Sequence, residues 1–297
     1  MNNTSTNSAG MTIAFDTIGG VRIRYAIGPT QAGPTILLTS PWPESILAFA
    51  PIWSTLARSA RLFAVDLPGF GGSERRDDLL SPRAMAAFLV ELIEELGLDK
   101  PHLIGPDIGT SAALFVAGAR PDLVSSVIVG SGAAAVPIQL GGALEQWVLA
   151  RDLDEFRAKD PRVIVGAALD TISGFALPVE VRNDYLDSYD GERFIESMRY
   201  VRSYPHQLAD LAQLLPFIET PALIIAGEHD RAVPLANAEF LHRRLPHSRL
   251  AIVDAGHFVW EEAATEYAGL VTEWVASGHR NATAPIERAR EVRLASA

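Results

Sequence analysis

The segment His102-Leu103-Ile104-Gly105-Pro106-Asp107-Ile108-Gly109-Thr110 passes from a short apolar run into a turn of small residues, and an alanine-rich stretch follows at 112–119. An apolar run bounded by Gly or Pro is typical of a buried central strand. Small residues on both sides of Asp107 allow the chain to reverse sharply from strand to helix, which leaves the central side chain projecting at the start of the helix. The segment therefore predicts a buried strand, a tight turn at Asp107 and a helix.

Two interpretations of Asp107 are open from these residues alone. Its side chain can cap the following helix, because Asp is a favoured N-cap residue and Gly is common in strand-to-helix turns. Alternatively, Asp107 can be a nucleophile that occupies the position of the serine in a nucleophile elbow. The remainder of the chain has to decide between the two.

Apolar runs alternate with helical stretches along most of the chain, which predicts an α/β fold with a mostly parallel sheet covered by helices on both faces. The first two strands, 12–16 and 21–27, flank Gly19-Gly20 and predict an antiparallel hairpin at the sheet edge. The predicted sheet has eight strands. The other six are expected at 35–38, 62–65, 102–104, 124–129, 222–226 and 250–253, with clear helices at 82–96 and 235–245 and a last amphipathic helix running through Trp274.

The alternation stops at residues 133–216, where charge and helical spacing replace strand signals. This stretch predicts a helical cap inserted into a core made of residues 12–132 and 217–276. Residues 1–11 are polar and are expected to form a disordered N-terminal tail. Residues 277–297 are polar and rich in Arg, and we expect a mobile C-terminal tail.

Two further strand ends decide between the interpretations of Asp107. Ligands of an open parallel sheet bind beyond the carboxyl ends of its strands. Gly227-Glu228-His229-Asp230 follows the run at 222–226, and Asp254-Ala255-Gly256-His257-Phe258 follows the run at 250–253. A nucleophile, an acid and a histidine in this order are the triad order of α/β-hydrolases. The sequence therefore predicts Asp107, Asp230 and His257 as catalytic residues.

Composition excludes several other classes of function. The 297 residues carry a formal charge of −11 with scattered basic residues, so neither nucleic acid nor an anionic membrane is an expected partner. The absence of cysteine excludes disulfides, thiol nucleophiles and cysteine-ligated zinc. His242 and His247 have the wrong spacing for two ligands on one helical face, so we predict no metal site and no cofactor. The expected partner is a small-molecule substrate, and a homodimer is left open.

The N-terminal residues contain neither a basic region nor an apolar run, unlike a signal peptide or a transmembrane segment. A cytoplasmic location is the resulting expectation.

The chain resembles the Asp-nucleophile branch of the α/β-hydrolase superfamily, which contains epoxide hydrolases and haloalkane dehalogenases. The likeness covers residues from about 20 to 277. It rests on five features in order along the chain, namely Ser40-Pro41-Trp42-Pro43-Glu44, Asp66-Leu67-Pro68-Gly69-Phe70-Gly71, the Asp107 turn, Asp230 and Gly256-His257.

The resemblance implies an oxyanion hole made by the backbone N–H groups of Trp42 and Ile108. Epoxide hydrolases commonly have His-Gly where this chain has Ser40-Pro41, so the local backbone can differ. They also use two cap tyrosines to donate hydrogen bonds to the epoxide oxygen, and Tyr200 is similar in position to the second of them. No tyrosine occurs at 133–184, where the first is expected.

Dehalogenases usually have a tryptophan directly after the nucleophile, and this chain has Ile108 there. Trp42 is then the remaining indole that could bind a halide or the rest of the substrate, which favours an epoxide over a haloalkane.

The implied mechanism has two steps. The Asp107 carboxylate displaces a leaving group from tetrahedral carbon, and His257, oriented by Asp230, activates the water that cleaves the resulting ester. Epoxide hydrolysis of a small hydrophobic substrate is the predicted function. The alternatives are haloalkane dehalogenation, ester or lactone hydrolysis, a biosynthetic step on the same scaffold and a non-catalytic ligand binder.

Overall fold

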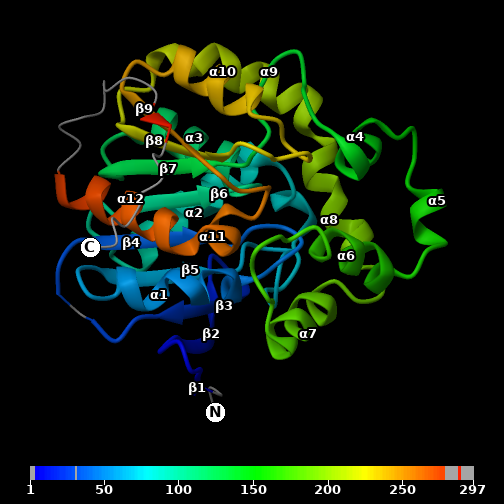
Figure 1. Ribbon diagram of the computed structural model, residues 1–297, viewed down its shortest axis with the longest axis horizontal. Helices are drawn as coiled ribbons and strands as arrows, with labels where there is room; N and C mark the ends of the chain where they lie inside the picture. The colour runs from blue at the N-terminus through cyan, green and yellow to red at the C-terminus, as the bar shows by residue number, and fades with distance from the viewer. Residues whose placement is uncertain (1–3, 31, 278–286, 289–297) are drawn as a thin grey trace, which may run out of the picture.

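A computed structural model describes residues 4–30, 32–277 and 287–288 of the chain. One ten-stranded sheet forms its centre, in the order β1-β2-β3-β5-β4-β6-β7-β8-β9-β10. Helix α1 (Ala50–Leu56) packs against α12 (Ala264–Ser277), and α2 (Pro82–Glu95) packs against α3 (Gly109–Ala119). The two pairs cover opposite faces of the sheet (Figure 1). The strands are β1 Ser5–Thr6, β2 Thr12–Ile18, β3 Val21–Ile27, β4 Thr35–Thr39, β5 Arg61–Val65, β6 His102–Pro106, β7 Ser126–Gly130, β8 Ala222–Gly227, β9 Ser248–Val253 and β10 Glu287–Arg288.

The α/β architecture predicted from the sequence is confirmed, but the sheet has two more strands than the predicted eight. Strand β1 pairs antiparallel with β2 within the N-terminal stretch that was expected to be disordered. Strand β10 pairs parallel with β9 within the expected C-terminal tail. Both strands have two polar residues and no apolar alternation, so sequence periodicity could not reveal them. Within the two predicted tails, residues 1–3, 278–286 and 289–297 lie outside the described residues.

The β2–β3 hairpin forms as the Gly19-Gly20 pair predicts. Both glycines have positive φ angles, 57° and 72°, which a two-residue hairpin turn requires. Because β1 lies beyond β2, the hairpin is one strand inside the edge of the sheet.

Every residue of strands β4, β6, β7, β8 and β9 is buried. Parallel strands covered on both faces need apolar side chains on both, which explains their short, continuous apolar runs. These strands run parallel to one another, so their carboxyl ends meet at one edge of the sheet. The loops after β4, β6, β8 and β9 therefore converge there.

Local signals define the core helices. In α2, the Ser81 hydroxyl accepts the Ala84 N–H, Pro82 occupies the first turn, and Met85, Leu89 and Leu92 form the buried stripe. The core helices whose bounds have not yet been given are η1 Ile46–Phe49, η2 Asp77–Leu79, α10 Ala236–Arg244 and α11 Val259–Glu262.

The regular elements at 133–216 are helical, and they project over one end of the sheet (Figure 1). These helices, which we call the cap, lie between β7 and β8. They are α4 Gly142–Leu149, α5 Asp154–Arg157, α6 Pro161–Leu169, α7 Val179–Ser188, α8 Arg193–Arg202, α9 Tyr204–Leu214 and η3 Leu215–Phe217.

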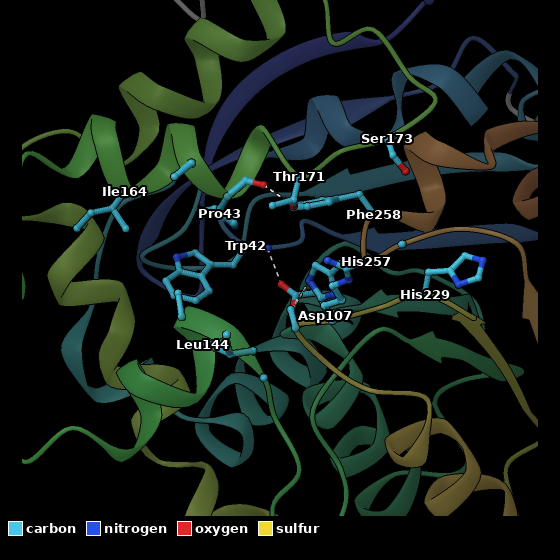
Figure 2. A pocket seen from close by; sticks show the side chains of 18 of the residues that line it. Trp42, Pro43, Asp107, Leu144, Ile164, Thr171, Ser173, His229, His257 and Phe258 are labelled. Carbon is cyan, nitrogen blue, oxygen red and sulfur yellow. Dashed lines mark hydrogen bonds and ion pairs between the residues drawn. The ribbon is translucent and has the colours of Figure 1, made fainter.

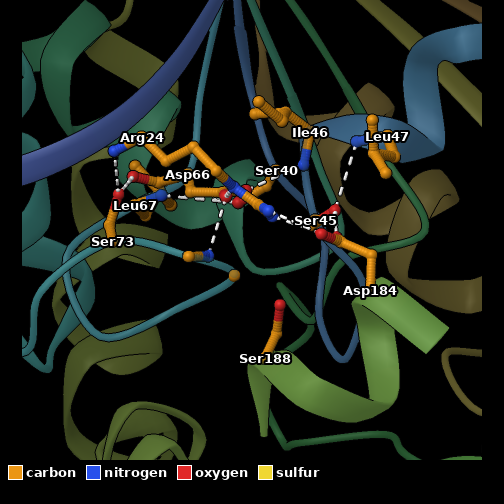
Figure 3. A network of polar contacts seen from close by, with 12 residues as sticks. Arg24, Ser40, Ser45, Ile46, Leu47, Asp66, Leu67, Ser73, Asp184 and Ser188 are labelled. Atoms are coloured by element: carbon orange, nitrogen blue, oxygen red, sulfur yellow. Dashed lines mark hydrogen bonds and ion pairs between the residues drawn. The ribbon is translucent and has the colours of Figure 1, made fainter. Parts of the chain in front are cut away.

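A buried ionic network fastens cap helix α7 to the core (Figure 3). The Arg24 guanidinium of β3 donates to both carboxylate oxygens of Asp184 on α7, at 2.6 and 3.1 Å, and also pairs with Asp66. The Ser45 hydroxyl donates to Asp184 at 2.6 Å. Because Asp66 also accepts the backbone N–H groups of Ile46 and Gly72, the network holds α7 against two loops of the core.

Candidate active site

Asp107 lies at the turn between β6 and α3 with a φ angle of 51°. This left-handed conformation is uncommon for a residue with a side chain, and it is the geometry of a nucleophile elbow. The flanking positions must be small: a Cβ on Gly105 would lie 2.5 Å from the Gly109 carbonyl oxygen, and one on Gly109 would lie 2.3 Å from the Thr39 hydroxyl. The small residues in the sequence are therefore required by close backbone approach.

The Asp107 carboxylate faces the loop after β4. Its Oδ2 accepts the backbone N–H of Trp42 at 2.7 Å, and the Ile108 N–H also donates to the carboxylate. Within the part of the chain that is described, no N–H of Thr110 or Ser111 bonds to this side chain, so it does not cap α3. The two N–H groups expected to form an oxyanion hole thus both point at Asp107, although Ser40-Pro41 replaces the usual His-Gly.

His257 and Asp230 complete the group, and Figure 2 shows His257 beside Asp107. The Nδ1 of His257 lies 2.8 Å from Asp230 Oδ2, and its Nε2 lies 3.7 Å from Asp107 Oδ1. Asp230 Oδ1 accepts the N–H groups of Ala232 and Val233, at 2.9 and 2.8 Å, which leaves Oδ2 for the imidazole. The structure therefore brings together all three residues that the sequence predicted as a triad.

Glu262 holds the loop that carries His257, and the sequence analysis missed it. Its carboxylate accepts the N–H of Gly256 at 2.8 Å and that of Phe258 at 3.2 Å, on either side of His257. The hydroxyl of Ser173, from the cap, donates to the same carboxylate at 2.8 Å. The sequence shows only that an acidic residue lies five positions after His257. The fold is needed to show that the Glu262 side chain bonds to the backbone of the His257 loop.

Burial and neighbouring charges act in opposite directions on the pKa values of Asp107 and His257, and both pKa values end above their ordinary values. Burial raises the pKa of Asp107 to about 6, although the His257 charge and the Trp42 and Ile108 N–H groups oppose it. Burial alone would lower the pKa of His257, but the charges of Asp230 and Asp107 outweigh it and raise this pKa to about 9. At neutral pH the pair is mainly an ionised carboxylate beside an imidazolium.

We expect the first chemical step at Asp107 to slow as the pH falls through about 6, because protonation removes the nucleophile. The measurement is the rate of product-burst or adduct formation between pH 5 and 8. An ester on Asp107, as the sequence predicts, would carry no charge, so we expect the His257 pKa to fall in such an intermediate and the imidazole to act as a base. A first step of constant rate down to pH 5 would contradict this assignment.

A cavity of about 850 Å³ opens above Asp107, between the core and the cap. Its volume lies within the range of sites for drug-sized molecules. The lining of the cavity contains both apolar and polar side chains, and the apolar part is the larger. The apolar lining residues are Trp42, Leu144, Trp147, Phe156, Ile164 and Phe258, and the polar ones include Gln146, Lys159, Ser173, His229 and Arg231.

Tyr200 does not reach this cavity, contrary to its expected role as a substrate-binding hydrogen-bond donor. Its hydroxyl donates to the Ile108 carbonyl oxygen at 2.8 Å, and its side chain is fully buried. The ring packs edge-on against Phe70 and Tyr204, with centroids 5.6 and 5.9 Å away. Tyr200 therefore packs the cap against the elbow. The side chain belongs to the interface because α8 turns this face toward the core.

Trp42 lines the cavity as predicted, but its indole N–H donates to the Ser197 hydroxyl at 2.9 Å. That donor is thus already used within the protein. Trp147 of α4 also lines the cavity and contacts Trp42 edge-on, with centroids 5.5 Å apart. Its indole forms no hydrogen bond with another residue of the described chain, so this N–H, unlike that of Trp42, is not used within the described residues.

Residues 4–30, 32–277 and 287–288 contain no group of three or more His, Cys, Asp or Glu side chains placed to hold a metal ion. No helix within the same residues is long and apolar enough to cross a membrane.

Comparison with known proteins places the geometry in context. The family model described as the alpha/beta hydrolase fold matches residues 34–264. The uncharacterized hydrolase YugF of Bacillus subtilis is 26% identical over 256 residues, which are 83% of this chain and 91% of YugF. A soluble epoxide hydrolase of a Corynebacterium species is 33% identical over 112 residues, 38% of each chain. The crystal structure of Cfl2 from Burkholderia cenocepacia superimposes with a TM-score of 0.80 at 22% identity, and covers 93% of this chain and 100% of Cfl2.

Proposed function

The chain belongs to the α/β-hydrolase fold family, and from that premise we propose that it hydrolyses a small hydrophobic substrate at saturated carbon through an ester on Asp107. One observation carries the proposal. A carboxylate, rather than a hydroxyl, occupies the elbow, with two backbone N–H groups on it and with Nε2 of a paired histidine 3.7 Å away. Epoxides are the preferred substrate class.

In the first step an Asp107 oxygen attacks a ring carbon of the epoxide. A C–O bond forms, the opposing C–O bond breaks, and the released alkoxide takes a proton from water. The hydroxide that remains is neutralised by the proton that the His257 imidazolium gives up to solvent, which leaves a neutral imidazole. An ionised carboxylate needs no base for this attack. The product of the step is a hydroxyalkyl ester of Asp107.

In the second step His257 removes a proton from water, and the resulting hydroxide adds to the ester carbonyl carbon. The Trp42 and Ile108 N–H groups then lie beside the oxygen that becomes negative, and each such donor is typically worth about 3 kcal/mol in barrier height. Collapse releases the diol and restores the Asp107 carboxylate and His257.

Support for an epoxide comes from Trp42-Pro43-Glu44 and from the partial likeness to a soluble epoxide hydrolase. Dehalogenation is the second candidate, and Trp147 favours it. An indole N–H can stabilise a departing halide by hydrogen bonding alone, whereas an alkoxide must also be protonated. A panel of terminal epoxides and haloalkanes with matched chain lengths, assayed for diol and for halide, separates the two.

A single turnover in ¹⁸O-labelled water tests whether Asp107 is the nucleophile. We expect the product of the first turnover to carry an unlabelled oxygen from Asp107, and the label to appear in the Asp107 carboxylate, detected by peptide mass spectrometry. Direct attack by water, with Asp107 as a base, would place the label in the product at once. That result would reject the ester intermediate.

A further inference from the structure

Two buried carboxyl groups meet behind the active site. Glu44 lies two residues after Trp42, and Glu261 lies four residues after His257 on α11. Their carboxyl groups lie within hydrogen-bonding range of one another, and the residues are 0% and 2% exposed. The pair thus joins the loop that supplies an oxyanion N–H to the segment that supplies the imidazole.

The other polar contacts of the pair are fully defined. Trp260 Nε1 donates to Glu44 Oε2 at 3.0 Å, and the Tyr185 hydroxyl of cap helix α7 donates to Glu261 Oε1 at 3.0 Å. The remaining oxygens, Glu44 Oε1 and Glu261 Oε2, receive no N–H or O–H donor from the rest of the described chain. An ionised carboxylate is only an acceptor, so a hydrogen bond between these two groups requires a proton on one of them.

The surrounding charges disfavour a second negative charge at Glu44. Asp107 acts on Glu44, and Glu262 acts on Glu261, both with negative charge. On α7, the negative charge of Asp184 acts on Tyr185, and Asp184 is itself paired with Arg24.

Two further groups complete the surroundings of the pair. Tyr189 donates to the Glu44 carbonyl oxygen at 2.8 Å, and the ring of His257 lies 6.2 Å from that of Trp260. Glu261 already accepts the Tyr185 hydroxyl, so it is the better site for the single negative charge.

We propose that Glu44 stays protonated and donates to an ionised Glu261, and that this one proton holds the Trp42 loop, the His257 segment and cap helix α7 in register. The link to catalysis rests on the proposed function. Glu44 touches neither the cavity nor the reacting atoms, so it is a positioning residue that acts through the Trp42 peptide.

The directions of the two pKa shifts agree with this arrangement. Burial raises the pKa of Glu44 well above its ordinary value, and burial also raises that of Glu261, to about 7. Two coupled carboxyl groups lose their protons in two separate steps, so the pair passes through a state that holds a single proton. Removal of that proton at alkaline pH places two negative charges in contact, which pushes the two segments apart.

The Glu44→Gln variant of the full chain is the direct test. Glutamine offers one acceptor to Trp260 and one donor to Glu261 at every pH, so we expect kcat within about threefold of wild type and no alkaline decline that depends on this proton. Glu44→Ala removes the donor, and we expect a fall in kcat of at least tenfold with little change in KM. Equal kcat values and pH profiles for the Gln and Ala variants would overturn the positioning role.

Glu261→Gln locates the proton. Its amide donates to Glu44, which can then ionise, so the negative charge moves next to Asp107. In the pH profile of the rate of the first chemical step, we expect the decline at low pH to shift to higher pH in this variant. In Glu44→Gln we expect this decline to stay in place. A shift in Glu44→Gln instead would show that the proton sits on Glu261.

Infrared spectroscopy tests the pair without any substrate. At pH 8 the wild type should show the carbonyl stretch of a protonated carboxyl group, and this band should be absent in Glu44→Gln and present in the control Glu94→Gln, which changes an exposed ion pair with Arg120. No such band would refute the shared proton and leave the proposed reaction untouched. A normal band in a protein that hydrolyses none of the panel substrates would refute the proposed reaction alone.

Discussion

An Asp107→Asn variant is expected to lose turnover by a factor on the order of 10⁴ or more, because the amide that replaces the carboxylate is a poor nucleophile. The change should leave the fold intact. Asparagine tolerates a φ angle of 51°, and its side-chain oxygen can still accept the Trp42 N–H. The measurement is kcat with the best substrate of the panel, together with intact mass after incubation.

The control is Asp122→Asn, which changes an exposed carboxylate paired with Arg120 and should retain wild-type turnover. Slow recovery of activity in Asp107→Asn accompanied by a mass shift would indicate deamidation back to Asp. Turnover in the variant without that mass shift would contradict a nucleophilic role, and Asp107 would then have only a structural one.

The order of elements could be predicted because each buried strand carries its own signal. Strands such as β4 and β7 are buried along their full length, so they appear as apolar runs whatever their neighbours are. Strands β1 and β10 could not be found in this way. Their two residues are held by pairing with β2 and β9, which is a tertiary contact and leaves no periodicity in the sequence.

The three residues of the proposed triad were predictable for a topological reason. Asp107, Asp230 and His257 each follow a parallel strand of the same sheet, so their order along the chain implies that they meet at one edge. The oxyanion N–H groups follow from the same rule, since they belong to the backbone of the loops after β4 and β6. Their positions do not depend on side-chain direction.

The cap residues were not predictable in the same way. Whether Tyr200 faces the cavity or the elbow depends on the rotation of α8 about its axis, and both orientations satisfy an amphipathic pattern. The cavity-lining indole that has no hydrogen-bond partner among the described residues is that of Trp147, on a different helix. Contacts such as that between Glu44 and Glu261 join residues 217 positions apart, and no spacing rule links them.

A His257→Gln variant is expected to stop the reaction halfway. The attack by Asp107 needs no base, whereas hydrolysis of the ester does, so the second step should slow by roughly 10²- to 10⁴-fold and an adduct should accumulate on Asp107. The His257 charge lowers the pKa of Asp107, and its loss raises that pKa further above the ordinary value. The trapping experiment should therefore be run at about pH 8, where the carboxylate remains ionised.

The mass of the trapped species also identifies the leaving group. Ring opening of an epoxide keeps every atom of the substrate, so the adduct gains the full substrate mass, whereas displacement of a halide adds only the alkyl group. His247→Gln, which changes an exposed histidine paired with Glu219, is the matched control and should show no stable adduct. If His257→Gln neither gains mass nor turns over with a substrate that the wild type consumes, the imidazole takes part in the first step, and a carboxylate that attacks unaided no longer describes this enzyme.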